Sequence, residues 1–116
     1  MHVTRSKFEA TESSGDVSAL LTRPADADCL LVLGHGAGAG MQHASVEALA
    51  VHLADRRIAT FRYQFAYMEQ GRGRPDHQPV LLQTVRSAVS AASVLSGGLP
   101  LFAGGRSMGG RMTSLA

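Results

Sequence analysis

Residues 104–111 read Gly-Gly-Arg-Ser-Met-Gly-Gly-Arg and contain the pattern Gly-x-Ser-x-Gly, with Ser107 at its centre. An apolar run at residues 99–103 leads into this pattern, and the stretch after it, residues 111–115, contains no proline and is compatible with a helix. A strand, a sharp turn with serine at its apex and a helix form the context in which this motif presents a nucleophile. The turn requires glycine at Gly105 and Gly109, because a Cβ at either position would crowd the neighbouring strand or helix.

A second glycine-rich stretch strengthens this interpretation, since the serine motif alone is explained equally well by a turn in which Ser107 caps the next helix. Residues 34–40 read Gly-His-Gly-Ala-Gly-Ala-Gly and follow the apolar run 29–33. In an acyl-transfer site, such a loop supplies a backbone N–H that binds the oxyanion of the tetrahedral intermediate. The predicted donors are the N–H groups of Ala37 and Met108. The glycines on either side of Ala37, Gly36 and Gly38, let the backbone approach a substrate.

A phosphate cradle is the alternative interpretation of the same loop, because a dinucleotide site also uses glycines between a strand and a helix. The spacing lacks the usual third glycine of that motif. The next strand ends at Arg62, which suits a 2′-phosphate better than a ribose hydroxyl. This alternative leaves the serine motif unexplained.

Composition limits the class of protein. The 116 residues are 45% hydrophobic and 17% charged, which is typical of one small globular domain. A net charge of +2 is too small to imply nucleic-acid binding, and no apolar run approaches the ~20 residues of a membrane span. The single cysteine, Cys29, excludes an internal disulfide and favours a reducing compartment. We therefore expect a cytoplasmic protein that needs no metal and no cofactor.

Strand and helix patterns alternate along most of the chain, which predicts an α/β fold with a mostly parallel sheet. Strands are predicted at residues 3–9, 17–22, 29–33, 58–61 and 101–103, helices at 41–55 and 79–95, and a loop at 68–78. The first two strands are separated by a polar turn and are expected to form an N-terminal β-hairpin.

Three motifs together resemble the α/β-hydrolase superfamily: residues 34–41 with His43, the triplet at 67–69, and residues 105–112. They look like a small dienelactone-hydrolase-like branch that includes testis-expressed hydrolase-like proteins and a subunit of the non-specific-lethal chromatin complex. The resemblance covers roughly residues 28–112. Relatives usually carry proline before the triplet, whereas this chain has Ala66.

The resemblance implies hydrolysis of an ester, lactone or thioester, with Ser107 as nucleophile and the amides of Ala37 and Met108 as the oxyanion hole. It also implies that His35 is a structural histidine packed beneath the glycine-rich loop. The triplet is assigned either to the substrate mouth or to a packed loop; its residues are Tyr67, Met68 and Glu69. The remaining histidines of the central region, His43, His52 and His77, are expected to be solvated or to cap helices.

The triad of this fold runs serine, then acid, then histidine along the chain, yet residues 108–116 contain no Asp, Glu or His. The resemblance therefore implies a single, apparently truncated domain over residues 1–116, corresponding to the N-terminal half of an α/β-hydrolase. Catalysis would need an acid and a base supplied from elsewhere. The strand at 101–103 would also be left at an exposed sheet edge, which favours self-association or a complementing chain. A non-catalytic interaction module is the second hypothesis.

Overall fold

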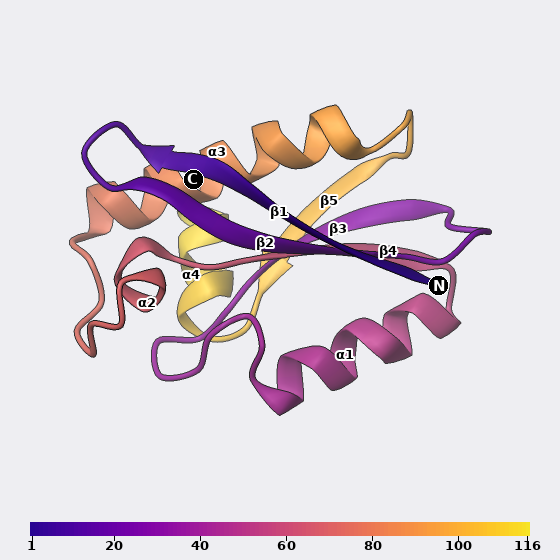
Figure 1. Cartoon of the computed structure of the whole chain (residues 1–116), viewed down its shortest axis with the longest axis horizontal. Coiled ribbons are helices and arrows are strands. Elements are labelled where there is room, and N and C mark those ends of the chain that lie inside the picture. Colours follow the sequence, from indigo (N-terminus) through magenta and orange to yellow (C-terminus); the bar gives the residue numbers. More distant parts are fainter.

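The computed structural model describes all 116 residues and shows a five-stranded mixed sheet with helices on both faces (Figure 1). The strands are β1 (His2–Thr11), β2 (Gly15–Arg23), β3 (Cys29–Gly34), β4 (Ile58–Tyr63) and β5 (Leu101–Gly105). The helices are α1 (Ala44–Asp55), α2 (Ala66–Glu69), α3 (Gln78–Leu95) and α4 (Met108–Leu115).

The order of strands across the sheet is β1-β2-β4-β3-β5. β1 and β2 form the expected antiparallel hairpin, and β2 also pairs antiparallel with β4. β3 lies between β4 and β5 and pairs in parallel with both. The predicted α/β class with an N-terminal hairpin is confirmed, although only two of the four strand pairs are parallel, and β5 forms one outer edge.

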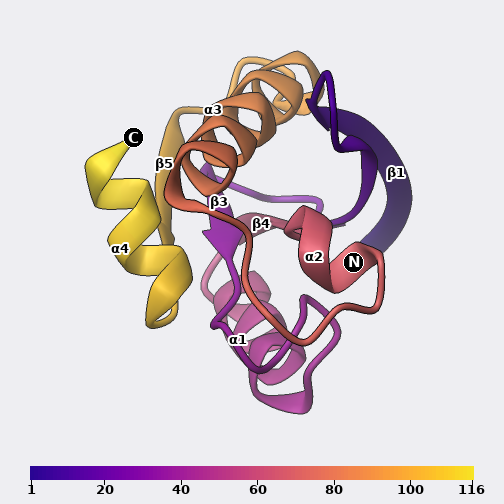
Figure 2. The same ribbon diagram turned by 90° about the vertical axis from the view of Figure 1, so that its left-hand side faces the viewer.

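The helices form two layers around the sheet, with α1 on one face and α3 and α4 on the other (Figure 2). The main core lies beneath α3, where Leu81, Val85 and Ala88 pack on apolar side chains of the central strands. Alternating residues of β4, Ala59, Phe61 and Tyr63, point into this core, because successive strand residues face opposite sides of a sheet. None of the helices is both long enough and apolar enough to cross a membrane.

Two local features differ from the sequence prediction. α1 begins at Ala44 rather than near residue 41, because His43 acts as its N-cap and accepts a hydrogen bond from the Ser45 N–H through Nδ1. The predicted 68–78 loop is helical at its start, because the short helix α2 runs to Glu69, and the Tyr67 N–H of this helix donates to Asp76 Oδ2 at 3.0 Å. Both differences involve side-chain hydrogen bonds to the backbone, which hydrophobic periodicity does not encode.

Candidate active site

The two glycine-rich turns meet at the carboxyl ends of adjacent parallel strands. Gly34 of β3 is opposite Gly105 of β5, and the Arg106 N–H donates to the Gly34 carbonyl oxygen at 3.0 Å. The loop that follows β3 and the turn that follows β5 therefore begin at the same point of the sheet edge. Ligand sites of parallel α/β sheets form at this end of the strands.

Ser107 occupies the apex of the second turn with an uncommon backbone conformation. Its φ is 51° and its ψ is −112°, and it directly precedes α4. A non-glycine residue in such a region carries a conformational cost of roughly 1–3 kcal/mol, and such residues cluster at functional sites. The side chain is exposed, so the turn presents the hydroxyl at the surface. The strand, turn and helix around Ser107 are those that the sequence predicts.

Close backbone packing explains the glycines that flank the serine. A Cβ on Gly109 would lie 2.4 Å from the Gly34 carbonyl carbon and 2.7 Å from the His35 carbonyl oxygen. A Cβ on Gly105 would lie 2.6 Å from the Gly34 carbonyl oxygen. All three separations are shorter than any ordinary contact, so β3, β5 and the start of α4 touch through bare backbone.

A cavity of about 380 Å³ opens beside Ser107. Its walls come from the loop after β3, the first turn of α1 and the turn after β5; the lining residues are Gly36, Ala37, Gly38, Ala39, His43, Ser45, Val46, Arg106 and Ser107. No acidic side chain lines it, whereas Arg106 does. The nucleophile candidate and the predicted oxyanion loop therefore share one cavity.

The structure places the two predicted oxyanion donors on the two turns. Ala37 lines the cavity, and its N–H makes no hydrogen bond within the chain. Met108 is the first residue of α4, and its side chain is buried against the core while its N–H belongs to the free first turn of the helix. One candidate donor therefore follows Ser107, and the other lies on the loop after β3.

His35 lies fully buried beneath the loop and uses both ring nitrogens locally. Nε2 accepts the Phe65 N–H at 3.0 Å, so the proton resides on Nδ1, which donates to the Gly36 carbonyl oxygen at 2.7 Å. Burial lowers the pKa of His35, and the bond to Gly36 opposes this effect. The imidazole is therefore held neutral and fixed, and it does not line the cavity beside Ser107.

None of the three residues at 67–69 lines this cavity. Tyr67 is fully buried, and its hydroxyl donates to the Ala37 carbonyl oxygen at 2.7 Å. Met68 lies under the far end of the loop, next to Gly40. Glu69 accepts hydrogen bonds from the Ser18 N–H and hydroxyl, both at 2.9 Å, and thereby joins α2 to β2.

The dinucleotide alternative finds no support at Arg62. This side chain is buried on the α1 side of the sheet, donates to the Met41 carbonyl oxygen at 3.2 Å and faces Glu47 at 3.8 Å. Burial lowers its pKa, and Glu47 opposes that effect. No group of three or more His, Cys, Asp or Glu side chains gathers where it could hold a metal ion.

The sequence profile of the family described as "Alpha/beta hydrolase domain" matches residues 27–116. The chain belongs to this family. The matched region contains the glycine-rich loop after β3 and the serine turn, so the family assignment and the site geometry rest on the same residues. Among curated proteins, no sequence matches the chain.

Solved structures share the fold of this α/β-hydrolase domain. A dienelactone hydrolase from Anabaena variabilis aligns with a TM-score of 0.80 at 16% identity, covering 97% of this chain and 55% of that one. A cold-adapted esterase from an Arctic intertidal metagenomic library aligns at 0.74 and 20% identity, covering 97% and 53%. Est1E from Butyrivibrio proteoclasticus aligns at 0.79 and 18%, covering 97% and 44%. The chain therefore spans about half the length of the solved structures that it matches.

Three residues that contribute to the site of the α/β-hydrolase domain escaped the sequence prediction. Arg106 lines the cavity directly before the nucleophile candidate. Gln64 accepts the Met41 N–H through Oε1 at 2.9 Å and so holds the end of the loop. Asp76 caps α2 at Tyr67. The position of Arg106 within the serine motif was a usable signal, whereas the other two act across the fold and leave no local pattern.

Proposed function

We propose that this α/β-hydrolase domain is a serine-hydrolase module that transfers an acyl group from an ester, lactone or thioester through Ser107. The observation that carries the proposal is the strained backbone of Ser107 at the junction of β5 and α4, beside an open cavity. A serine is held in this conformation when the turn must present its hydroxyl above the sheet. The fold shared with a dienelactone hydrolase and with esterases supports the same class of chemistry.

In the proposed reaction, the Ser107 oxygen attacks the substrate carbonyl carbon and its proton passes to a general base. The N–H groups of Ala37 and Met108 donate to the resulting oxyanion. Loss of one such donor typically reduces kcat by a factor of about 10²–10³. The Ser107 hydroxyl is a weak nucleophile without an adjacent base, and residues 108–116 contain no Asp, Glu or His. We therefore assign the acid and the base either to residues that precede Ser107 or to a second chain.

Labelling with a fluorophosphonate probe tests this proposal on the purified chain. We expect labelling that disappears in the Ser107→Ala variant, with far-ultraviolet circular dichroism showing that both proteins are folded. A folded wild-type chain that stays unlabelled would count against an activated serine and favour the second candidate function.

The second candidate is a non-catalytic interaction module, and the outer edge of β5 favours it. β5 contains no charged residue, Phe102 is 60% exposed, and no strand of this chain pairs with its outer side. Next to it, a cavity of about 320 Å³ is lined mainly by apolar side chains of α3 and β5, including Val85, Val89 and Ala103. Unpaired apolar edge strands tend to pair with another chain. We propose self-association or a complementing chain at this edge.

Sedimentation velocity over a range of protein concentrations tests self-association through the outer edge of β5. The interaction module predicts a concentration-dependent dimer that Phe102→Lys weakens. Val3→Lys is the matched control, because Val3 is 55% exposed on β1 at the opposite edge. A wild-type chain that stays monomeric, or two variants with equal effects, would contradict self-association through β5.

We also propose a branch of the family and a cellular location for this chain. The dienelactone-hydrolase-like branch with the testis-expressed and non-specific-lethal-complex proteins is supported by the three sequence motifs. A cytoplasmic location is supported by Cys29, which is the only cysteine and is partly buried.

A further inference from the structure

The loop after β3 is held from beneath by a buried tyrosine on a separate segment of the chain. The Tyr67 hydroxyl donates to the Ala37 carbonyl oxygen at 2.7 Å, and the same hydroxyl lies 4.0 Å from the Met108 sulfur. Tyr67 is 0% exposed. Burial, and then the negative charge of Asp76, raise its pKa, so the hydroxyl keeps its proton and remains a donor. One side chain therefore contacts both residues that supply the predicted oxyanion donors.

The direction of the Ala37 carbonyl determines the direction of the next amide. In a trans peptide group, the C=O bond and the following N–H bond point in opposite directions within one plane. Since the Ala37 oxygen is turned inward to Tyr67, the Gly38 N–H is turned outward, away from the core. Gly38 lines the cavity, and its N–H makes no hydrogen bond within the chain.

The preceding peptide group obeys the same rule. His35 holds the Gly36 carbonyl oxygen, so the Ala37 N–H points away from that imidazole. Two consecutive carbonyl groups of the loop are thus held from the core side by two different buried side chains. Two consecutive amides, those of Ala37 and Gly38, are left without acceptors on the cavity side.

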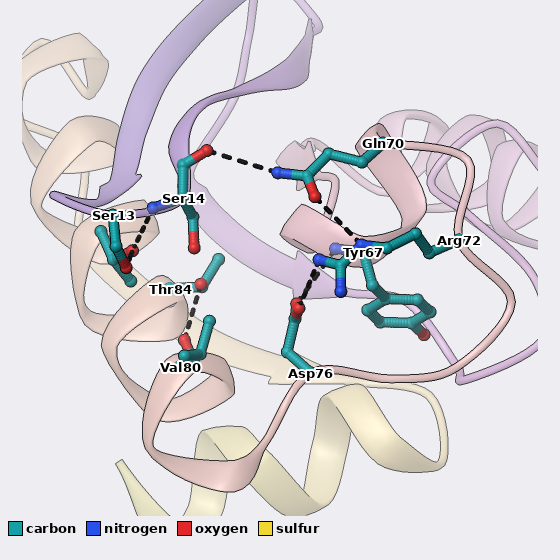
Figure 3. Close-up of polar contacts among 9 residues, drawn as sticks. Ser13, Ser14, Tyr67, Gln70, Arg72, Asp76, Val80 and Thr84 are labelled. Atoms are coloured by element: carbon teal, nitrogen blue, oxygen red, sulfur yellow. Dashed lines mark hydrogen bonds and ion pairs between the residues drawn. The ribbon is translucent and has the colours of Figure 1, made fainter.

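Tyr67 is itself fixed by contacts in the segment around α2 (Figure 3). Its N–H donates to Asp76 Oδ2, and the other oxygen of that carboxylate accepts Arg72 Nη2 at 2.9 Å. The Asp76 side chain is only 7% exposed, whereas the Arg72 side chain is 52% exposed, so the bridge is shielded from solvent on the carboxylate side only. Gln70 extends the network by accepting Arg72 Nε and donating to the Ser14 carbonyl oxygen in the hairpin. The tyrosine therefore has a defined position from which to set the loop.

We propose that Tyr67 is a positioning residue that orients the Ala37–Gly38 peptide, so that the Gly38 amide faces the cavity as a further oxyanion donor beside those of Ala37 and Met108. Tyr67 does not contact the substrate and acts through the loop. The orientation of the peptide stands on geometry alone, whereas the oxyanion role of the Gly38 amide rests on the proposed hydrolase function.

Backbone ¹⁵N relaxation measured by NMR tests the orientation, with Tyr67→Phe compared with Tyr63→Phe. The two substitutions remove the same atom from equally buried rings, but the Tyr63 hydroxyl faces Thr113 without a hydrogen bond of ordinary geometry. We expect the Gly38 order parameter to be about 0.85 in the wild-type chain and in Tyr63→Phe, and to fall below about 0.6 in Tyr67→Phe. A mobile Gly38 in the wild type, no change in Tyr67→Phe, or an equal fall in both variants would overturn the proposal.

A measurement on the wild-type chain covers the case in which Tyr67→Phe does not fold. The bond to Ala37 predicts a slowly exchanging hydroxyl proton on Tyr67, with a nuclear Overhauser contact to Ala37. Rapid exchange of the Tyr67 hydroxyl proton would overturn the proposal without any variant.

Fluorophosphonate labelling separates this proposal from the function on which its catalytic part rests. In a chain that labels at Ser107, Tyr67→Phe should slow labelling by about tenfold, less than the full loss of one donor, while Tyr63→Phe stays within about twofold. Equal rates in the wild type and Tyr67→Phe would overturn the catalytic part. An unlabelled wild type with a mobile Gly38 in Tyr67→Phe would instead contradict the hydrolase function and support the positioning role.

Discussion

The loop after β3 and the serine turn after β5 meet at one edge of the sheet but are held in different ways. The serine turn is fixed by backbone packing, since Gly105 and Gly109 press against Gly34 with no room for a Cβ. The loop touches the core through side chains, chiefly His35 beneath Gly36 and Tyr67 beneath Ala37.

The two regions therefore tolerate different kinds of substitution. Backbone packing fixes the nucleophile candidate independently of pH and of side-chain conformation, but it admits no substitution. Side-chain hydrogen bonds hold the predicted oxyanion donors in a way that single atoms and single protons can alter. The serine turn should therefore respond to added volume, and the loop to lost hydrogen bonds.

The largest expected effect comes from Gly109→Ala. The new Cβ would meet backbone atoms of Gly34 and His35, which cannot rotate away, so we expect a loss of about 3 kcal/mol in the free energy of unfolding. Gly38→Ala is the matched control in the loop, because a Cβ there meets nothing within 4 Å. Urea denaturation measures both variants, and equal losses would show that the serine turn is not fixed by packing.

The second prediction concerns pH and His35. Burial lowers the pKa of this histidine below the ordinary value of 6.5, so the unfolded chain binds its proton at a higher pH than the folded chain does. Stability from this group is complete above pH 6.5 and falls as the pH drops below that value, by at most about 1.4 kcal/mol per pH unit.

Urea denaturation at about pH 7 and about pH 5.5, on either side of the ordinary histidine pKa, checks this dependence. The His35→Gln variant places an amide oxygen where it can accept the Phe65 N–H without titrating, so its stability should change less over the same interval. Identical pH dependence in the two proteins would exclude His35 as the titrating group that holds the loop.

The fold and the serine turn could be predicted because their signals are local. Gly105 and Gly109 indicate close backbone packing, and the apolar runs predict the buried strands. The role of Tyr67 could not be predicted in the same way, because the segment from Gln64 to Asp76 has no period that assigns each side chain to a face. The sequence left Tyr67 between the substrate mouth and a packed loop, and the contacts that direct it inward come from Asp76 and Ala37.

The third prediction concerns the strain at Ser107. Ser107→Gly removes the Cβ from a backbone at φ 51° and should raise the free energy of unfolding by about 1 kcal/mol, after the entropic cost of glycine. Ser107→Ala keeps the Cβ and should show no such gain. Thermal denaturation of the three proteins compares them, and equal stability of the two variants would argue against stored strain.

The smallest effect is expected for Tyr63→Phe. The hydroxyl of Tyr63 is buried without a hydrogen bond of ordinary geometry. Its removal should therefore either lower the free energy of unfolding by at most about 0.5 kcal/mol or raise it. Tyr67→Phe should lose about 1 kcal/mol, the net value of a typical hydrogen bond. Urea denaturation ranks the two variants, and the reverse order would break the distinction between the two buried tyrosines.

The position of β5 in the sheet has a consequence for the order of folding. The β1–β2 hairpin closes across a short turn at residues 12–14, whereas β5 pairs with β3 by bringing Leu101 to Leu30. That pairing closes a loop of about 70 residues, and loop-closure entropy rises with loop length. Contacts between residues distant in the sequence also slow folding. The serine turn and the loop beside it should therefore meet late, after α1, β4 and α3 are in place. A chain that has formed only its hairpin contains the nucleophile residue but no site.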